Sequence, residues 1–247
     1  MAGTAVVASG NYDLEIDTGF IQDAFLLDDP VQGLLNNTEY VLNGTTDFAS
    51  VLDGVNSISV RRGRRDQGDQ FSAGTMSFTM LDTAGIFNPF DTNSPYYDTP
   101  QAQPGLAPMR RVRLSRYSSL NVKEYIFVGV IVNFDYNFAL GGLDTVTVFC
   151  ADDFYLLAQT YLDEFNVSEE LSSARVTAVL DRPEVAFPAL TRDIATGTQT
   201  LGGASAFTID QGTNVLGYLS NVNEAEQGRL FMSRDGDLVF DARLGTT

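Results

Sequence analysis

The strongest structural signal in this sequence is the alternation of apolar and polar residues along Tyr125–Tyr136. A strand places every second side chain on the same face, so this period predicts a long β-strand. Thr145–Cys150 has the same period, with Val146, Val148 and Cys150 on the face expected to point to the core. The two segments are the predicted arms of a hairpin, which commits this part of the chain to an antiparallel sheet.

Shorter segments extend the pattern on both sides of this hairpin. Three more strands are predicted before it, and three helices and a second hairpin after it. The prediction is therefore a β-rich α+β fold, in which an antiparallel sheet or barrel precedes a smaller helix-plus-hairpin unit. The strands are Ser57–Arg61, Thr75–Met80 and Arg111–Ser115; the helices are Asp153–Leu162, Ser173–Leu180 (N-cap Ser172 or Ser173) and Thr213–Gln227 (C-cap Gly228); the hairpin is Arg229–Ser233 with Leu238–Arg243.

Missing residue types exclude most catalytic chemistry. The chain has no histidine and one cysteine, Cys150, which removes Ser/His/Asp and Cys/His catalysis, histidine or thiolate metal sites and internal disulfides. No phosphate loop or dinucleotide-binding motif occurs. Lys123, the only lysine, is read as a solvated surface residue. We therefore expect no catalytic residue, no metal and no cofactor.

Charge is strong and unevenly distributed. The net charge is −17, from 32 acids against 15 bases, which argues against specific nucleic-acid binding. No apolar run approaches the ~18 residues needed to span a bilayer, so we expect no membrane insertion, and no basic n-region suggests a secretory signal. Residues 1–60 carry nine acids and no base, whereas residues 61–116 carry eight bases, all of them arginines.

These eight arginines form two clusters and are the candidate contact residues. Arginine pairs carboxylates in a planar, bidentate geometry. Two interpretations stay open: the clusters pair with acids of this same chain, or they dock onto an acidic neighbouring subunit. They are Arg61, Arg62, Arg64, Arg65, Arg110, Arg111, Arg113 and Arg116.

The chain divides into three predicted parts. Residues 1–54 are read as an N-terminal acidic arm, 55–152 as the β-domain and 153–247 as a smaller α+β domain. Within the second part, Ile86–Pro108 holds five of the eight prolines and predicts a long ordered loop of the functional or interfacial kind.

An ordered series of short motifs resembles the minor tail proteins of long-tailed bacteriophages. The resemblance runs from about Phe25 to Phe240. Asp82-Thr83 stands where that family often has Asp-Asn. No single motif is specific, but their order is. The motifs include Phe25–Leu35, Ser59–Arg65, Phe71–Thr75, Leu81–Pro89, Ser94–Tyr97, Arg110–Val112, Phe127–Gly129, Ala151–Phe154, Ser173–Arg175, Arg192–Ile194, Asn214–Leu219 and Leu230–Phe231.

This resemblance implies a structural role at the distal end of a virion tail, with synthesis in the host cytoplasm. It implies a tail-tube-like β-barrel and a hub-like ring that joins the tail tube to distal tip proteins. A trimer is favoured, with a hexameric distal tail protein or collar as the alternative. The implied partners are copies of this chain, the tail tube, distal tail and other tail-tip proteins, with the tape measure protein as a further candidate.

Two functions of other classes stay as alternatives. A tail-associated cell-wall hydrolase would need two carboxylates ~5 to 9.5 Å apart in a deep cleft. A carbohydrate-binding module would need exposed aromatic side chains in a groove, here Tyr or Phe because the chain has no Trp.

Overall fold

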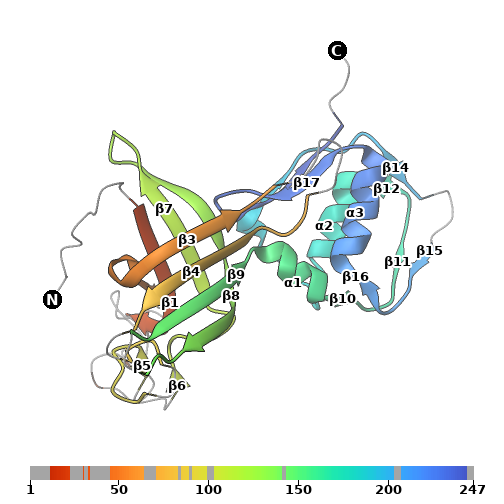
Figure 1. Ribbon diagram of the computed structural model, residues 1–247. Helices are drawn as coiled ribbons and strands as arrows, with labels where there is room; N and C mark the ends of the chain where they lie inside the picture. The colour runs from red at the N-terminus through yellow and green to blue at the C-terminus, as the bar shows by residue number, and fades with distance from the viewer. Residues whose placement is uncertain are drawn as a thin grey trace. The chain divides into compact units, whose positions relative to one another are not determined.

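The chain forms two compact units in the computed structural model (Figure 1). The first combines Met1–Ser59 with Ser77–Cys150, and the second combines Val60–Met76 with Ala151–Thr247. The structure describes residues 12–22, 30, 33, 45–63, 71–82, 85–88, 91–98, 103–140, 143–202 and 207–243.

A seven-stranded sheet dominates the first unit. Its strand order is β2-β1-β7-β8-β9-β4-β3, and the pairs β1–β2, β1–β7 and β7–β8 are antiparallel. All five strands predicted for this part of the chain are present. Two further strands come from residues 1–54, which the sequence analysis assigned to an arm. The bounds are β1 Tyr12–Gln22, β2 Thr45–Ser50, β3 Val55–Arg61, β4 Thr75–Leu81, β7 Arg111–Tyr117, β8 Lys123–Asn137 and β9 Thr145–Ala151.

Alternation along the strands places one face of this sheet in a core. Val146, Val148 and Cys150 are buried as predicted, and burial raises the pKa of the Cys150 thiol. In β8, Phe127 and Ile131 are fully buried. The register with β7 shifts between Leu114 and Ser115, and such a bulge changes which face the following residues occupy.

The two edges of the sheet are consecutive in the chain. Strands β2 and β3 are joined by Val51 and the short 3₁₀ turn η1 (Leu52–Gly54). Laid flat, seven strands would put these edges ~29 Å apart, at ~4.8 Å per strand. The link from Ser50 to Val55 spans at most ~18 Å. The sheet must therefore curl strongly. Among the described strands, β2 and β3 are still the two ends of the hydrogen-bonded order.

A proline-rich loop precedes β7. It contains one short antiparallel ladder, β5 (Tyr97–Asp98) with β6 (Gln103–Pro104). The Ser94 hydroxyl donates to the Ile86 carbonyl at 2.5 Å, which fixes the start of the loop. Gly105 is packed so tightly that a Cβ there would overlap the Tyr96 carbonyl oxygen.

Three helices and a small sheet form the second unit. Helices α1 (Asp153–Gln159), α2 (Ser172–Leu180) and α3 (Val215–Glu226) share one apolar core with the sheet β13-β18-β17. All three helices and the final hairpin were predicted. The remaining elements are β10 Tyr161–Leu162, β11 Phe165–Val167, β12 Glu170–Leu171, η2 Ala189–Thr191, β13 Arg192–Ile194, β14 Thr200–Leu201, β15 Phe207–Ile209, β16 Thr213–Asn214, β17 Arg229–Met232 and β18 Leu238–Asp241.

Two predicted helix caps are wrong. The N-cap of α2 is Leu171, because the Ser172 hydroxyl donates to the buried Glu226 carboxylate instead of capping the helix. Helix α3 ends in the left-handed conformation at Gln227 (φ 58°), one residue before the predicted glycine.

The β-rich α+β class is confirmed by these elements, with a large antiparallel sheet before a smaller helical unit. Closure of the large sheet into a barrel stays a prediction, as do the three domain boundaries.

Candidate functional site

The two arginine clusters belong to different units. Arg61 ends β3 with an exposed side chain, and Arg62 follows it in the second unit. Arg64 and Arg65 lie outside the described residues. Arg110, Arg111, Arg113 and Arg116 all lie at or in β7, in the first unit. A role of these residues in subunit or domain contacts stays a prediction.

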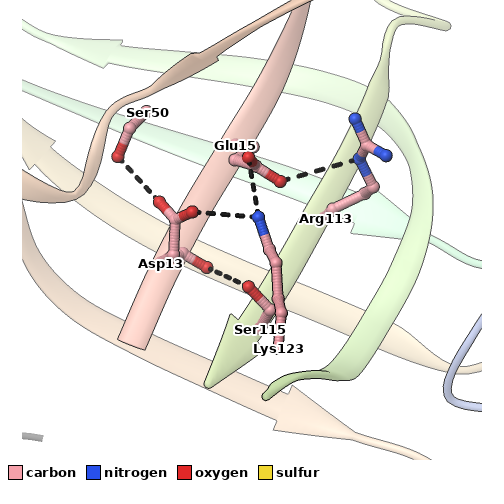
Figure 2. A network of polar contacts seen from close by, with 6 residues as sticks. All are labelled: Asp13, Glu15, Ser50, Arg113, Ser115 and Lys123. Carbon is pink, nitrogen blue, oxygen red and sulfur yellow. Dashed lines mark hydrogen bonds and ion pairs between the residues drawn. The ribbon is translucent and has the colours of Figure 1, made fainter. Parts of the chain in front are cut away.

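Arg113 lies in a network on the charged face of the sheet (Figure 2). This face is the side of β2, β1, β7 and β8 that carries Asp13 and Glu15, which alternate along β1 with the buried Leu14 and Ile16. The Nε of Arg113 lies 3.7 Å from Oε2 of Glu15. Its guanidinium carbon lies 3.3 Å from the centroid of the Phe48 ring of β2. An arginine over an aromatic face is attracted by the ring as well as by the carboxylate.

Lys123 joins β8 to β1 across β7. Its Nζ lies 3.1 Å from Oδ2 of Asp13 and 2.8 Å from Oε1 of Glu15, as Figure 2 shows. Burial acts to lower the pKa of Lys123, but hydrogen bonds and the charges of both carboxylates outweigh it and raise the pKa. Its side chain is only 27% exposed. The prediction of a solvated lysine is therefore wrong.

Arg116 and Arg110 also have partners within the first unit. Nε and Nη2 of Arg116 donate to the same oxygen of Glu124, at 3.3 and 3.1 Å, in an exposed pair. Nε of Arg110 donates to the Gly105 carbonyl at 3.1 Å. Its guanidinium occupies the space where Gly19 has no side chain. Three arginines of the second cluster therefore contact groups of their own unit.

Arg62 lines a cleft of about 450 Å³ in the second unit. Its Nη2 donates to the Met232 carbonyl at 2.9 Å, and burial lowers the pKa of the guanidinium although Asp152 and Asp235 oppose this. One wall is apolar, because the Phe71 and Phe231 rings meet there at 5.0 Å.

Asp152 is the most perturbed carboxylate of the cleft. Burial raises its pKa to about 6, against the opposing effect of the amides and of Arg62. Its Oδ2 accepts from the Gly74 amide at 2.7 Å and its Oδ1 from the Phe154 amide at 3.1 Å. Both carboxylate oxygens therefore accept hydrogen bonds from backbone amides, and the bond from Phe154 makes Asp152 the N-cap of α1. This geometry gives Asp152 a structural role, although Asp235 lines the same cleft.

Two buried charged residues of the second unit were missed by the sequence analysis. Glu226, 1% exposed, accepts from Ser172, Thr198, Gln199 and the Arg243 amide. Arg175, also 1% exposed, pairs with Glu170 and donates to the Tyr218 hydroxyl and the Ser168 carbonyl, both at 2.8 Å. No local pattern marks Glu226, because its partners lie 17 to 54 residues away in the sequence. Arg175 has two partners close before it, Glu170 and Ser168, and its third partner, Tyr218, lies 43 residues further along the chain.

Neither a metal-ligand cluster nor a membrane-spanning helix occurs among the described residues. Among those that the structure describes, no three His, Cys, Asp or Glu side chains are grouped to hold a metal ion. No described helix is long and apolar enough to cross a membrane.

The fold resembles solved phage tail proteins. The 43 kDa tail protein of prophage MuSo2 from Shewanella oneidensis is 12% identical with a TM-score of 0.51, over 94% of this chain and 54% of that one. A tail protein from Neisseria meningitidis MC58 is 12% identical with a TM-score of 0.45, over 76% and 50%. The Escherichia coli c3393 protein, a type VI secretion component, is 13% identical with a TM-score of 0.43, over 75% and 48%.

Of these three, the Shewanella structure reaches a similarity that bears on the fold. It confirms the resemblance to tail proteins at the level of the fold. The chain spans about half the length of these three structures. No protein-family model matches the sequence, and a search of the curated proteins finds no match.

Proposed function

We propose that this chain is a structural component of a bacteriophage tail, located at the distal end of the virion tail. The observation that carries the proposal is the shared fold with the Shewanella tail protein over 94% of this chain. The ordered motifs from Phe25 to Phe240 support the same class independently of the fold.

Within the tail, the chain forms a hub-like ring that joins the tail tube to distal tip proteins. The curled sheet supports a ring, because its edge strands β2 and β3 present backbone groups that natural β-proteins pair or cover. A trimer is favoured, and a hexameric distal tail protein or collar is the alternative. Closure of the sheet into a barrel belongs to the same proposal; it would pair part of β2 with β3, and the ring contact then uses the edge positions that are left unpaired.

Native mass spectrometry of detached tail tips tests this function. Three copies of the chain are expected, or six for the alternative. A single copy in each tip would exclude both rings, and absence of the chain from purified tails would refute the structural role itself.

The chain is proposed to have no catalytic activity. The cleft that contains Asp152 and Asp235 is the place where a two-carboxylate hydrolase would be sought. Both oxygens of Asp152 already accept hydrogen bonds from backbone amides, which disfavours this carboxyl group as a proton donor. Zymography on host cell wall should therefore be blank, and a band that disappears in Asp152→Asn would contradict the proposal.

A further inference from the structure

The turn between β8 and β9 exposes three large apolar side chains. Phe138 is 72% exposed, Leu140 109% and Leu143 58%, and we call these three residues the β8–β9 tip. Single exposed apolar residues are common, but several close together mark an interaction surface. The tip lies at the end of β8 where β5 and β6 also lie (Figure 1).

The fold holds this tip in place. Phe138 continues a row of near-parallel rings along β8, with Phe134, Tyr136 and Phe138 at 6.2 Å between successive centroids. The Tyr136 hydroxyl donates to the Phe87 carbonyl at 2.9 Å. On the other side of the turn, Oδ1 of Asp144 accepts from the Ala139 amide at 2.8 Å. An ordered apolar surface loses less conformational entropy when it binds.

Charge indicates what covers the tip. The sequence has no lysine or arginine between Arg65 and Arg110, or between Lys123 and Arg175. The loop before β7 and the β8–β9 turn come from these two stretches, so their charged groups are all acidic. Asp144, next to Leu143, is partly exposed, and Asp135 is exposed three residues before Phe138. The surface is thus apolar with an acidic surround.

We propose that the β8–β9 tip docks onto an apolar patch of another protein, and that the rim of this patch carries arginine or lysine. Opposite charges at the rim favour encounter and orient the partner, while the apolar side chains supply the contact. Two copies meeting through this same end would bring acidic groups together, and anionic lipid would be repelled. The proposal deepens the proposed function and rests on it only for the partner's place in a tail.

The test uses the purified full chain and a synthetic helical peptide with leucines on one face and lysines along both borders. The matched peptide has glutamate in place of lysine. We expect binding of the lysine peptide, and a loss of about tenfold or more in affinity for Phe138→Ser with Leu140→Ser. Leu120→Ser is the control, because Leu120 is 84% exposed in the turn between β7 and β8, and its effect should stay within about twofold.

Several results would overturn the proposal. These are no binding of the lysine peptide, equal binding of the glutamate peptide, or equal losses in the tip and control variants. Tip-dependent self-association in sedimentation velocity would identify a second copy as the occupant. Tip-dependent binding to phosphatidylcholine or phosphatidylglycerol vesicles would identify lipid. Absence of the chain from purified tails would refute the tail function and leave the peptide result unaffected.

Discussion

Replacing Glu226 by glutamine is expected to destabilise the second unit by ~2 to 3 kcal/mol at pH 7, about the value of hydrogen bonds to a charged group. The carboxylate accepts from the Ser172 hydroxyl at 2.5 Å, the Thr198 hydroxyl at 2.7 Å and the Gln199 amide at 2.9 Å. Glutamine keeps one acceptor oxygen but turns an NH₂ group toward these donors. The NH₂ group then faces a donor, so a repulsive donor–donor contact replaces hydrogen bonds that the carboxylate accepted.

The pKa sets an upper limit on this effect. Burial acts to raise the pKa of Glu226, but the hydrogen bonds from Ser172, Thr198 and Gln199 outweigh it and lower the pKa from 4.5 to about 2. Each tenfold change in proton affinity corresponds to ~1.36 kcal/mol, so the ionised form of Glu226 contributes at most ~3.4 kcal/mol to the free energy of unfolding.

The sign of the pH dependence follows from the lowered pKa. A carboxylate with a folded pKa below its unfolded pKa stabilises the protein above the unfolded value, and this stability is lost as pH falls toward the folded value. Here the window runs from 4.5 down to about 2. At pH 3 the wild type should have lost ~2 kcal/mol of the contribution. Glutamine does not titrate. The difference in free energy of unfolding between the wild type and Glu226→Gln should therefore be smaller at pH 3 than at pH 7 by about that amount.

Hydrogen-exchange mass spectrometry of peptides from α2 and α3 measures this difference within the second unit. Glu224→Gln is the matched control, because it removes an equal charge from an exposed position of the same helix. An unchanged difference between pH 7 and pH 3, or protection in Glu226→Gln equal to wild type, would refute the reasoning.

Two further predictions concern the first unit. Lys123→Met should destabilise it by ~1 to 3 kcal/mol at neutral pH, measured by exchange in β1 peptides, because half-buried carboxylates lose their cation. In the wild type, the raised pKa of Lys123 means that its contribution to the free energy of unfolding is full below pH 10.5 and falls as pH rises through the folded pKa. Hydrogen-exchange protection of β1 that persists at high pH would contradict this prediction. Gly105→Ala should lower the urea midpoint by an amount equivalent to ~1 to 3 kcal/mol, because the new methyl group meets the Tyr96 carbonyl; an unchanged midpoint would show that the backbone yields freely.

Local pattern predicted the elements well, since periodicity depends only on neighbouring residues. β7, β8 and β9 were all predicted within three residues of their observed ends, and so was α3. β1 was missed, although Leu14 and Ile16 alternate there with acids. Residues 1–54 were assigned to an acidic arm, because the cations that pair with Asp13 and Glu15 lie more than ninety residues further along the chain.

Contacts between distant segments could not be predicted in the same way. Nothing near Glu226 in the sequence shows that Thr198 and Arg243 will meet it. The error at the start of α2 has this origin, because the Ser172 hydroxyl, a good capping group, donates to a distant carboxylate instead. Local capping preferences yield when a buried charge needs the same donor.

The charge distribution of the chain has a structural use in the first unit. Asp13 and Glu15 come from the base-free segment 1–60, and leaving both half-buried without a cation would be costly. Lys123 and Arg113 neutralise them from the two strands that follow β1 in the sheet. These cations are thereby held in the fold and are poorly placed to contact a phosphate backbone, since their charge is already balanced at short range. In the proposed ring, these two cations would therefore not retain DNA that passes along it.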